Sequence, residues 1–214
     1  MSLLINEIFY SIQGESLQAG RPCVFVRLTG CNLRCSYCDT RYAYEAGTLL
    51  DIPEVEHRIA QYQCRLVEIT GGEPLIQEDT PLLISILLSK GYEVMLETNG
   101  SMDISRVDQR CMKILDIKCP SSNESDQNDP ANLARLDSKD QIKFVIGNRE
   151  DYEYAKKRIP LIPHPIPGNH ILFSPVQGML NPKILSEWIL LDHLGVRLHL
   201  QLHKIIWPNT NRGV

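Results

Sequence analysis

The chain has 214 residues, 43% of them hydrophobic and 22% charged, with a formal net charge of −4. This composition excludes wholesale disorder, and the length suffices for one domain with a sizeable core. The acidic balance argues against a nucleic-acid groove, and no apolar run is long enough to span a membrane. Because residues 1–14 lack a secretory signal and the seven cysteines are an odd number, we expect reduced thiols and a cytoplasmic location.

The predicted elements alternate between short apolar strands and helical patterns. In chain order we expect strand 24–28, helix 54–63, strand 66–70, helix 81–90, strand 93–97, helix 104–110, strands 113–117 and 142–146, helix 150–158, strand 170–174, helix 182–193 and strand 197–201. The strands are continuous apolar runs, which is typical of strands buried on both faces. Strand–helix–strand repetition therefore predicts an α/β fold with a parallel sheet and right-handed crossovers.

The length also limits how far such a sheet closes. A complete eight-fold barrel takes about 250 residues, so six or seven shorter repeats predict an incomplete TIM-like barrel with reduced helical crossovers. In such folds the chemistry lies just past the carboxyl ends of the strands. We expect a polar loop at 119–129 and a stiff, proline-rich connection at 160–168. Without an internal repeat or a linker, residues 1–214 are expected to form one domain.

Three cysteines directly after the first of these strands are the most informative feature. Cys31, Cys35 and Cys38 have the spacing Cys-x3-Cys-x2-Cys, and a loop of this size can place three thiolates around an iron–sulfur cluster. A structural zinc site would need a fourth ligand, such as Cys23 or His57, and usually a second paired arm, which the sequence lacks. Three unrelated core cysteines are a further alternative, which a polar loop disfavours.

The other cysteines lack this arrangement. We expect Cys23, Cys64 and Cys111 in or near the core, and we assign no role to Cys119.

Polar motifs follow several later strands. Gly71–Pro74 combines two glycines, which let a ligand approach the backbone, with a carboxylate that can accept from an ammonium group. Glu97–Gly100, Asp116–Lys118 and Phe173–Gly178 deliver polar groups to the same edge of the sheet. Simple turns and a solvated Lys118 are the alternatives, and Lys143 could point inward or into solvent.

The segment Glu7–Ser16 places Gln13, Gly14 and Glu15 between apolar stretches. We interpret it as a recognition loop for a flat, hydrogen-bonding ring, and an exposed hairpin turn is the alternative.

The cysteine spacing, with Tyr37 before the last cysteine, resembles that of radical S-adenosylmethionine (SAM) enzymes. Together with the Gln13 segment, Gly71–Pro74, Glu97–Gly100 and Gln201–Lys204, it resembles the 7-carboxy-7-deazaguanine synthase family nearly end to end. The resemblance implies a lyase that converts 6-carboxy-5,6,7,8-tetrahydropterin to 7-carboxy-7-deazaguanine, for 7-deazapurines such as queuosine. A radical derived from SAM, used catalytically, would take the hydrogen from C6 before ring contraction and loss of ammonia.

The resemblance also implies the cofactors, partners and site residues. It implies a [4Fe–4S] cluster, SAM, Mg²⁺, a pterin substrate, a flavodoxin- or ferredoxin-like electron donor and a homodimer. The residues carried over are Cys31, Cys35 and Cys38 for the cluster; Thr40 for Mg²⁺; Tyr37, Cys38, Asp39, Gly72, Asp116, Ile117, Lys118, Ser174, Pro175, Val176 and Gln177 for SAM; and Ile12, Gln13, Gly14, Arg27, Thr70 and Pro208 for the substrate.

The sequence departs from the family pattern at two places, Ser16 and the residues after Pro208. The family usually has Gly where Ser16 stands, and its chains end at or near the proline that Pro208 matches, whereas Asn209–Val214 follow here. A radical SAM activase acting on a partner protein is one alternative function, and a non-enzymatic iron–sulfur or zinc scaffold is another. For the dimer, Trp188, Ile189 and Leu190 could form an apolar patch or pack on the last strand.

Overall fold

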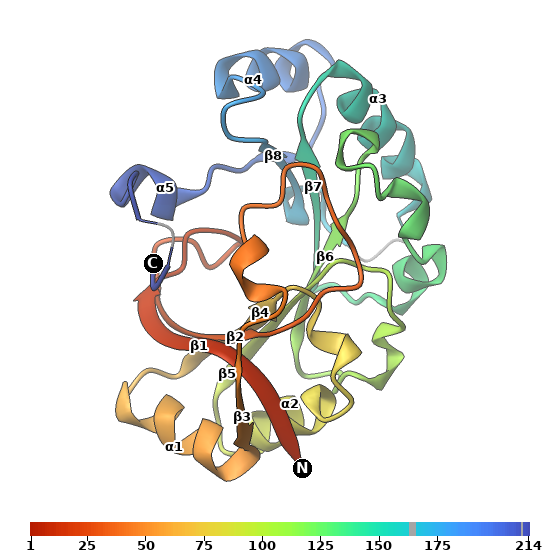
Figure 1. Ribbon diagram of the computed structural model, residues 1–214. Helices are drawn as coiled ribbons and strands as arrows, with labels where there is room; N and C mark the ends of the chain where they lie inside the picture. Colours follow the sequence, from red (N-terminus) through yellow and green to blue (C-terminus); the bar gives the residue numbers. More distant parts are fainter. Residues whose placement is uncertain (163–165, 211) are drawn as a thin grey trace.

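The computed structural model describes the whole chain except residues 163–165 and 211. In this part of the chain nine strands form one sheet, in the order β3-β1-β2-β4-β5-β6-β7-β8-β9 (Figure 1). The strands are β1 (Ser2–Ile12), β2 (Pro22–Leu28), β3 (Thr48–Asp51), β4 (Leu66–Gly71), β5 (Glu93–Thr98), β6 (Met112–Ile117), β7 (Gln141–Ile146), β8 (Ile171–Pro175) and β9 (Arg197–Leu198). The α-helices are α1 (Ile52–Gln61), α2 (Thr80–Ser89), α3 (Arg149–Arg158), α4 (Pro182–Leu191) and α5 (Leu202–Ile206).

The sheet is parallel from β2 to β9, and only β1 pairs antiparallel, with β2 and β3. Because β3 and β9 are the two edges and do not pair, the barrel stays open, which confirms the predicted incomplete barrel. The parallel strands end on one side of the sheet, and the loops that follow them gather there (Figure 1).

Local signals in the sequence explain where helices begin and end. Asp51 caps α1 by accepting a hydrogen bond from the Glu54 backbone, and a proline occupies the first turn. Helix α2 ends at the cap residue Lys90, and Gly91 adopts a φ of +81° that favours glycine. Val55, Ile59 and similar side chains on the inner faces of the helices join strand residues in the larger of two hydrophobic clusters.

Three predicted boundaries are wrong. Residues 7–12 belong to β1, in which the polar Asn6 and Glu7 interrupt the apolar residues where the pairing with β2 shifts register. The loop is the hairpin between β1 and β2. The helix expected at 104–110 is only a 3-10 turn at Ile104–Arg106, since Val107 returns to an extended backbone. The last strand covers only Arg197–Leu198, not 197–201.

The irregular segments have short 3-10 turns. The polar segment 119–129 contains turns at Pro120–Ser122 and Ser125–Gln127, and part of the proline-rich connection, residues 163–165, lies outside the described residues. Only 3-10 turns connect β5 to β6 and β6 to β7, so the helical crossovers are reduced there. Within the described residues, no helix has the length and apolar character needed to cross a membrane.

Candidate active site

A cavity of about 410 Å³ lies at the carboxyl ends of the parallel strands. Its wall includes the β1–β2 hairpin, the cysteine loop after β2, the ends of β4 to β8 and the C-terminal segment. The predicted site residues found in this wall are Ile12, Gln13, Gly14, Arg27, Cys31, Cys35, Tyr37, Cys38, Asp39, Thr40, Thr70, Gly72, Asp116, Lys118, Pro175, Val176 and Gln177. Three others, Ile117, Ser174 and Pro208, are not part of it: the first two are buried in the sheet and Pro208 is exposed after α5.

The loop that carries the three cysteines is held from behind by the segment after β6. Ser36, between two of the cysteines, donates its N–H to the Ser122 carbonyl at 3.0 Å and its hydroxyl to the Ser121 carbonyl at 2.6 Å. The buried carboxylate of Asp151, at the start of α3, accepts the N–H and the hydroxyl of Ser121. The polar segment therefore braces the cysteine loop.

The three cysteines lie together in the cavity wall. All three are half-buried free thiols in the cavity wall. Three thiolates in one cavity wall match the ligand set of a [4Fe–4S] cluster, which would bind each of them through a different iron.

Hydrogen bonds also favour a bound thiolate. Cys31 Sγ accepts from the Leu33 N–H at 3.4 Å and from the Asn99 amide at 3.8 Å. Burial raises the pKa of the Cys31 and Cys35 thiols, and the nearby Lys118 ammonium opposes this rise. These N–H donors and the cation would stabilise the negative charge of a cluster.

Gly71–Pro74 brings the end of β4 against the cysteine loop. A Cβ atom on Gly72 would lie 2.1 Å from the Gly30 carbonyl oxygen and 2.6 Å from Cys31 Cβ, so only glycine fits. The carboxylate of Glu73 does not face the cavity. It is buried and accepts hydrogen bonds from the Thr98 hydroxyl at 2.9 Å and the Asn99 N–H at 2.6 Å, which brace the end of β5.

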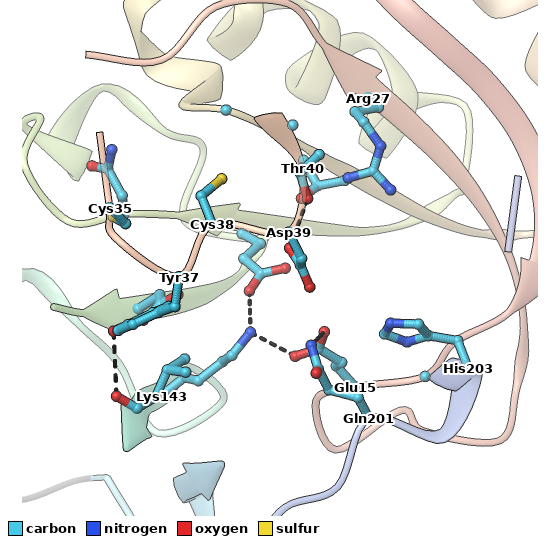
Figure 2. A pocket seen from close by; sticks show the side chains of 18 of the residues that line it. Glu15, Arg27, Cys35, Tyr37, Cys38, Asp39, Thr40, Lys143, Gln201 and His203 are labelled. Atoms are coloured by element: carbon cyan, nitrogen blue, oxygen red, sulfur yellow. Dashed lines mark hydrogen bonds and ion pairs between the residues drawn. The ribbon is translucent and has the colours of Figure 1, made fainter. Parts of the chain in front are cut away.

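Charged side chains form the polar floor of the cavity. Lys143 Nζ lies 2.6 Å from Glu15 Oε2 and 2.7 Å from Glu97 Oε1, and it points inward (Figure 2). Burial would lower the pKa of Lys143, but the two carboxylates outweigh burial and hold this pKa well above its usual value. Burial would likewise raise the pKa of Glu15, yet Lys143 keeps it below its usual value. Lys143 and Glu15 are therefore charged, whereas burial raises the pKa of Glu97 in spite of its contact with Lys143.

The predicted substrate residue Arg27 has free capacity for a ligand. Its Nε donates to Glu7 Oε1 at 2.7 Å, and its guanidinium lies 5.6 Å from the Phe9 ring centre and 5.8 Å from that of Tyr42. Among the described residues no acceptor takes the two terminal amino groups. These two amino groups can donate parallel hydrogen bonds to the two oxygens of a carboxylate.

The C-terminal segment closes the side of the cavity next to the hairpin. Leu202 donates its N–H to the Gly14 carbonyl at 2.9 Å, and the Gln201 amide donates to Glu15 at 2.8 Å. Val214 also lies in the cavity wall. The tail that departs from the family pattern is thus next to the site.

Several cavity residues were not assigned from the sequence: Glu15, Glu68, Glu97, Lys143, Gln201 and His203. The signal for two of them is a charged residue inside an apolar strand, Glu68 in β4 and Lys143 in β7. A charged residue there is costly unless it is paired, so its position alone indicates a functional or buried ionic role.

Comparisons with known proteins agree with this geometry. Residues 25–120 match the Radical SAM superfamily. The chain is 48% identical to the 7-carboxy-7-deazaguanine synthase of Chlorobaculum tepidum, over 99% of this chain and 97% of that protein. It is 40% identical to the enzyme of that name from Koribacter versatilis, over 98% and 99% of the two chains. The crystal structure of QueE from Escherichia coli has the same fold, with a TM-score of 0.78 at 23% identity over 94% of each chain. The chain therefore belongs to the 7-carboxy-7-deazaguanine synthase family of radical SAM enzymes.

Proposed function

We propose that this enzyme is a lyase that converts 6-carboxy-5,6,7,8-tetrahydropterin to 7-carboxy-7-deazaguanine in 7-deazapurine biosynthesis, including that of queuosine. The observation that carries the proposal is the single cavity shared by the cysteine loop, Gly72 and the Gln13 hairpin. A pterin bound at the hairpin would lie in the same space as a SAM molecule bound at the cysteines.

Cys31, Cys35 and Cys38 would hold the [4Fe–4S] cluster, and the fit described above supports this assignment. When bound and reduced, the cluster and SAM would supply the carbon radical needed to take a hydrogen atom from C6 of the substrate. SAM would be contacted by Tyr37, Cys38, Asp39, Gly72, Asp116, Ile117, Lys118, Ser174, Pro175, Val176 and Gln177. Lys118 lies 2.8 Å from Asp116, and the other oxygen of Asp116 is buried without a partner among the described residues.

The substrate would be bound by Ile12, Gln13, Gly14, Arg27, Thr70 and Pro208. Arg27 would fork onto the pterin carboxylate, because its terminal amino groups are available. Pro208 lies outside the cavity wall.

Mg²⁺ would bind near Thr40. The Thr40 hydroxyl lies 2.9 Å from Asp39 Oδ1 and faces the cavity (Figure 2). Hydroxyl oxygen is a hard ligand of the kind that Mg²⁺ prefers, and the ion would share its other positions with substrate and water.

We further propose that residues 1–214 form one radical SAM core domain, with the N-terminal hairpin as its substrate-recognition segment. A flavodoxin- or ferredoxin-like donor would reduce the cluster.

The homodimer would use the outer face of α4. Ile189 is buried and Trp188 packs against Tyr152, with ring centres 5.3 Å apart, whereas Leu190 and Leu191 are 72% and 75% exposed. Twofold pairing would cover these leucines. Anaerobic light scattering should give a dimer that Leu190→Glu converts to monomers; a monomeric parent at micromolar concentration would contradict the proposal.

Anaerobic reconstitution tests the function. The enzyme, incubated with SAM, a reductant and the carboxytetrahydropterin, should release 7-carboxy-7-deazaguanine and ammonia, detected by mass spectrometry and a coupled ammonia assay. Arg27→Lys keeps the cation but loses the fork, so the KM for the pterin should rise. Cleavage of SAM without pterin turnover would overturn the proposed substrate.

A further inference from the structure

Glu68 is a buried carboxyl group to which the proposed function gives no role. It lies in the middle of β4 in an otherwise apolar run, is 4% exposed, and forms part of the cavity wall. An unpaired carboxylate in such a place would be costly. The protonation and hydrogen bonding of Glu68 therefore need an explanation.

The neighbouring Gln13 fixes which oxygen of Glu68 accepts a hydrogen bond. Gln13 Oε1 accepts the N–H of Glu15 at 2.9 Å, so its other end must be the amide nitrogen. That nitrogen donates to Glu68 Oε2 in a short hydrogen bond. Because Gln13 is 1% exposed, water does not compete for this contact. Glu68 Oε2 is thus an acceptor.

The charges around Glu68 favour its neutral form. Burial first, and then the carboxylates of Glu97 on β5 and Glu15 in the hairpin, raise the pKa of Glu68 to about 8. The Gln13 amide and Lys143 on β7 oppose this rise, but Lys143 is already shared by the other two carboxylates.

Two groups of β2 also face Glu68. The Arg27 guanidinium is paired with Glu7, and burial keeps the pKa of the Cys23 thiol well above its usual value. Neither group titrates near neutral pH, so they do not change its charge there.

The proton of Glu68 then has one position. In the neutral acid the proton would lie on Oε1, because Oε2 accepts from Gln13 and the described residues offer Oε1 no acceptor. We propose that Glu68 is a neutral carboxylic acid whose Oε1–H donates a hydrogen bond to the ring of the bound heterocycle, at a carbonyl oxygen or an unprotonated ring nitrogen. This inference rests on the proposed function and makes Glu68 a specificity-determining residue for that substrate.

Binding of the carboxytetrahydropterin to the anaerobic, SAM-loaded holoenzyme without reductant tests the inference, because no turnover occurs. If the pterin binds only to enzyme in which Glu68 is neutral, the Kd of the parent for the pterin should rise about tenfold from pH 7 to pH 9, as expected for a pKa of about 8. Glu68→Gln keeps an acceptor for Gln13 and a donor toward the cavity. Its Kd should match the parent at pH 7 and stay flat to pH 9.

Matched variants complete the test. Glu93→Gln changes an exposed carboxylate at the start of β5 and should follow the parent at every pH. Glu68→Met lacks the donor and should bind at least about tenfold more weakly at pH 7, the loss expected when a hydrogen bond to a buried group is missing; its cluster absorbance reports folding. A tenfold rise that persists in Glu68→Gln would overturn the inference, as would a Glu68→Gln variant that binds normally but loses turnover, which would indicate proton transfer. A parent that binds no pterin would overturn the proposed function, and this inference with it.

Discussion

Lys204 Nζ lies 2.5 Å from Asp39 Oδ2, so an ion pair joins helix α5 to the loop that carries the three cysteines. Burial alone would raise the pKa of Asp39, but Lys204 and the Thr40 hydroxyl together hold it below its usual value. The same helix contacts the hairpin through Leu202 and Gly14. The two loops proposed to bind SAM and substrate are therefore held together by one short helix.

Loss of this ion pair should weaken substrate binding without affecting the cluster. We expect Lys204→Met to raise the KM for the pterin by up to about fivefold, because a partly exposed ion pair is worth at most about 1 kcal/mol. The iron–sulfur absorbance should not change. Lys183→Met, in an exposed part of α4, is the control. An unchanged KM in Lys204→Met would show that α5 keeps its place without the pair.

Gly14 lets α5 pack closely against the hairpin because it has no side chain. A Cβ atom at this position would lie 2.2 Å from His203 Nδ1 and 2.9 Å from the His203 backbone nitrogen. We expect Gly14→Ala to displace α5 and to raise the KM at least tenfold, measured by steady-state kinetics. Gly195→Ala, which meets no atom within 4 Å, should behave like the parent. Equal KM values for the two variants would contradict the close packing of α5 on the hairpin.

The sequence predicts the strands of the parallel sheet and the loop of three cysteines, because both depend on local patterns. Apolar runs such as 142–146 identify a buried strand, and the spacing of Cys31, Cys35 and Cys38 defines a ligand set. The polar floor depends instead on long-range contacts. Glu15 and Lys143 are 128 residues apart in the chain, and no local pattern indicates that they form an ion pair.

Antiparallel pairing of β1 was missed for a related reason. In this strand the polar Asn6 and Glu7 separate two short apolar groups, so it resembles a loop until the partner strand is known. The direction of Glu73 likewise depends on Thr98 and Asn99 at the end of a different strand.

Cluster binding should depend on Cys31, Cys35 and Cys38. We expect alanine at any of them to abolish the iron–sulfur absorbance and SAM cleavage. Cys111→Ala, at a fully buried core position, should keep the cluster and lose roughly 1–3 kcal/mol of unfolding free energy. Absorbance spectra after anaerobic reconstitution check the cluster, and thermal unfolding checks the loss of stability. A folded Cys111→Ala protein without a cluster would contradict this ligand set.

Magnesium dependence should require the hydroxyl of Thr40. We expect Thr40→Ala to bind the cluster and SAM but to lose most of its stimulation by Mg²⁺, because one oxygen of a near-octahedral shell is missing. Thr40→Ser retains the hydroxyl and should restore the response. The measurement is turnover as a function of Mg²⁺ concentration. If Thr40→Ala responds to Mg²⁺ as the parent does, the ion binds elsewhere.

Glu68 should also make stability depend on pH in the absence of substrate. Its pKa is near 4.5 in the unfolded chain and about 8 in the folded protein, so the folded state binds more protons between these values. The free energy of unfolding should therefore be highest below about pH 4.5 and fall until about pH 8 as far as this group contributes. Glu68→Gln lacks this titration. Its Tm relative to the parent should rise from pH 5 to pH 8 in anaerobic thermal unfolding, whereas the difference for Glu93→Gln should stay constant. A constant difference for Glu68→Gln would mean that Glu68 is already ionised in the folded protein, which would remove the physical basis for its role as a donor.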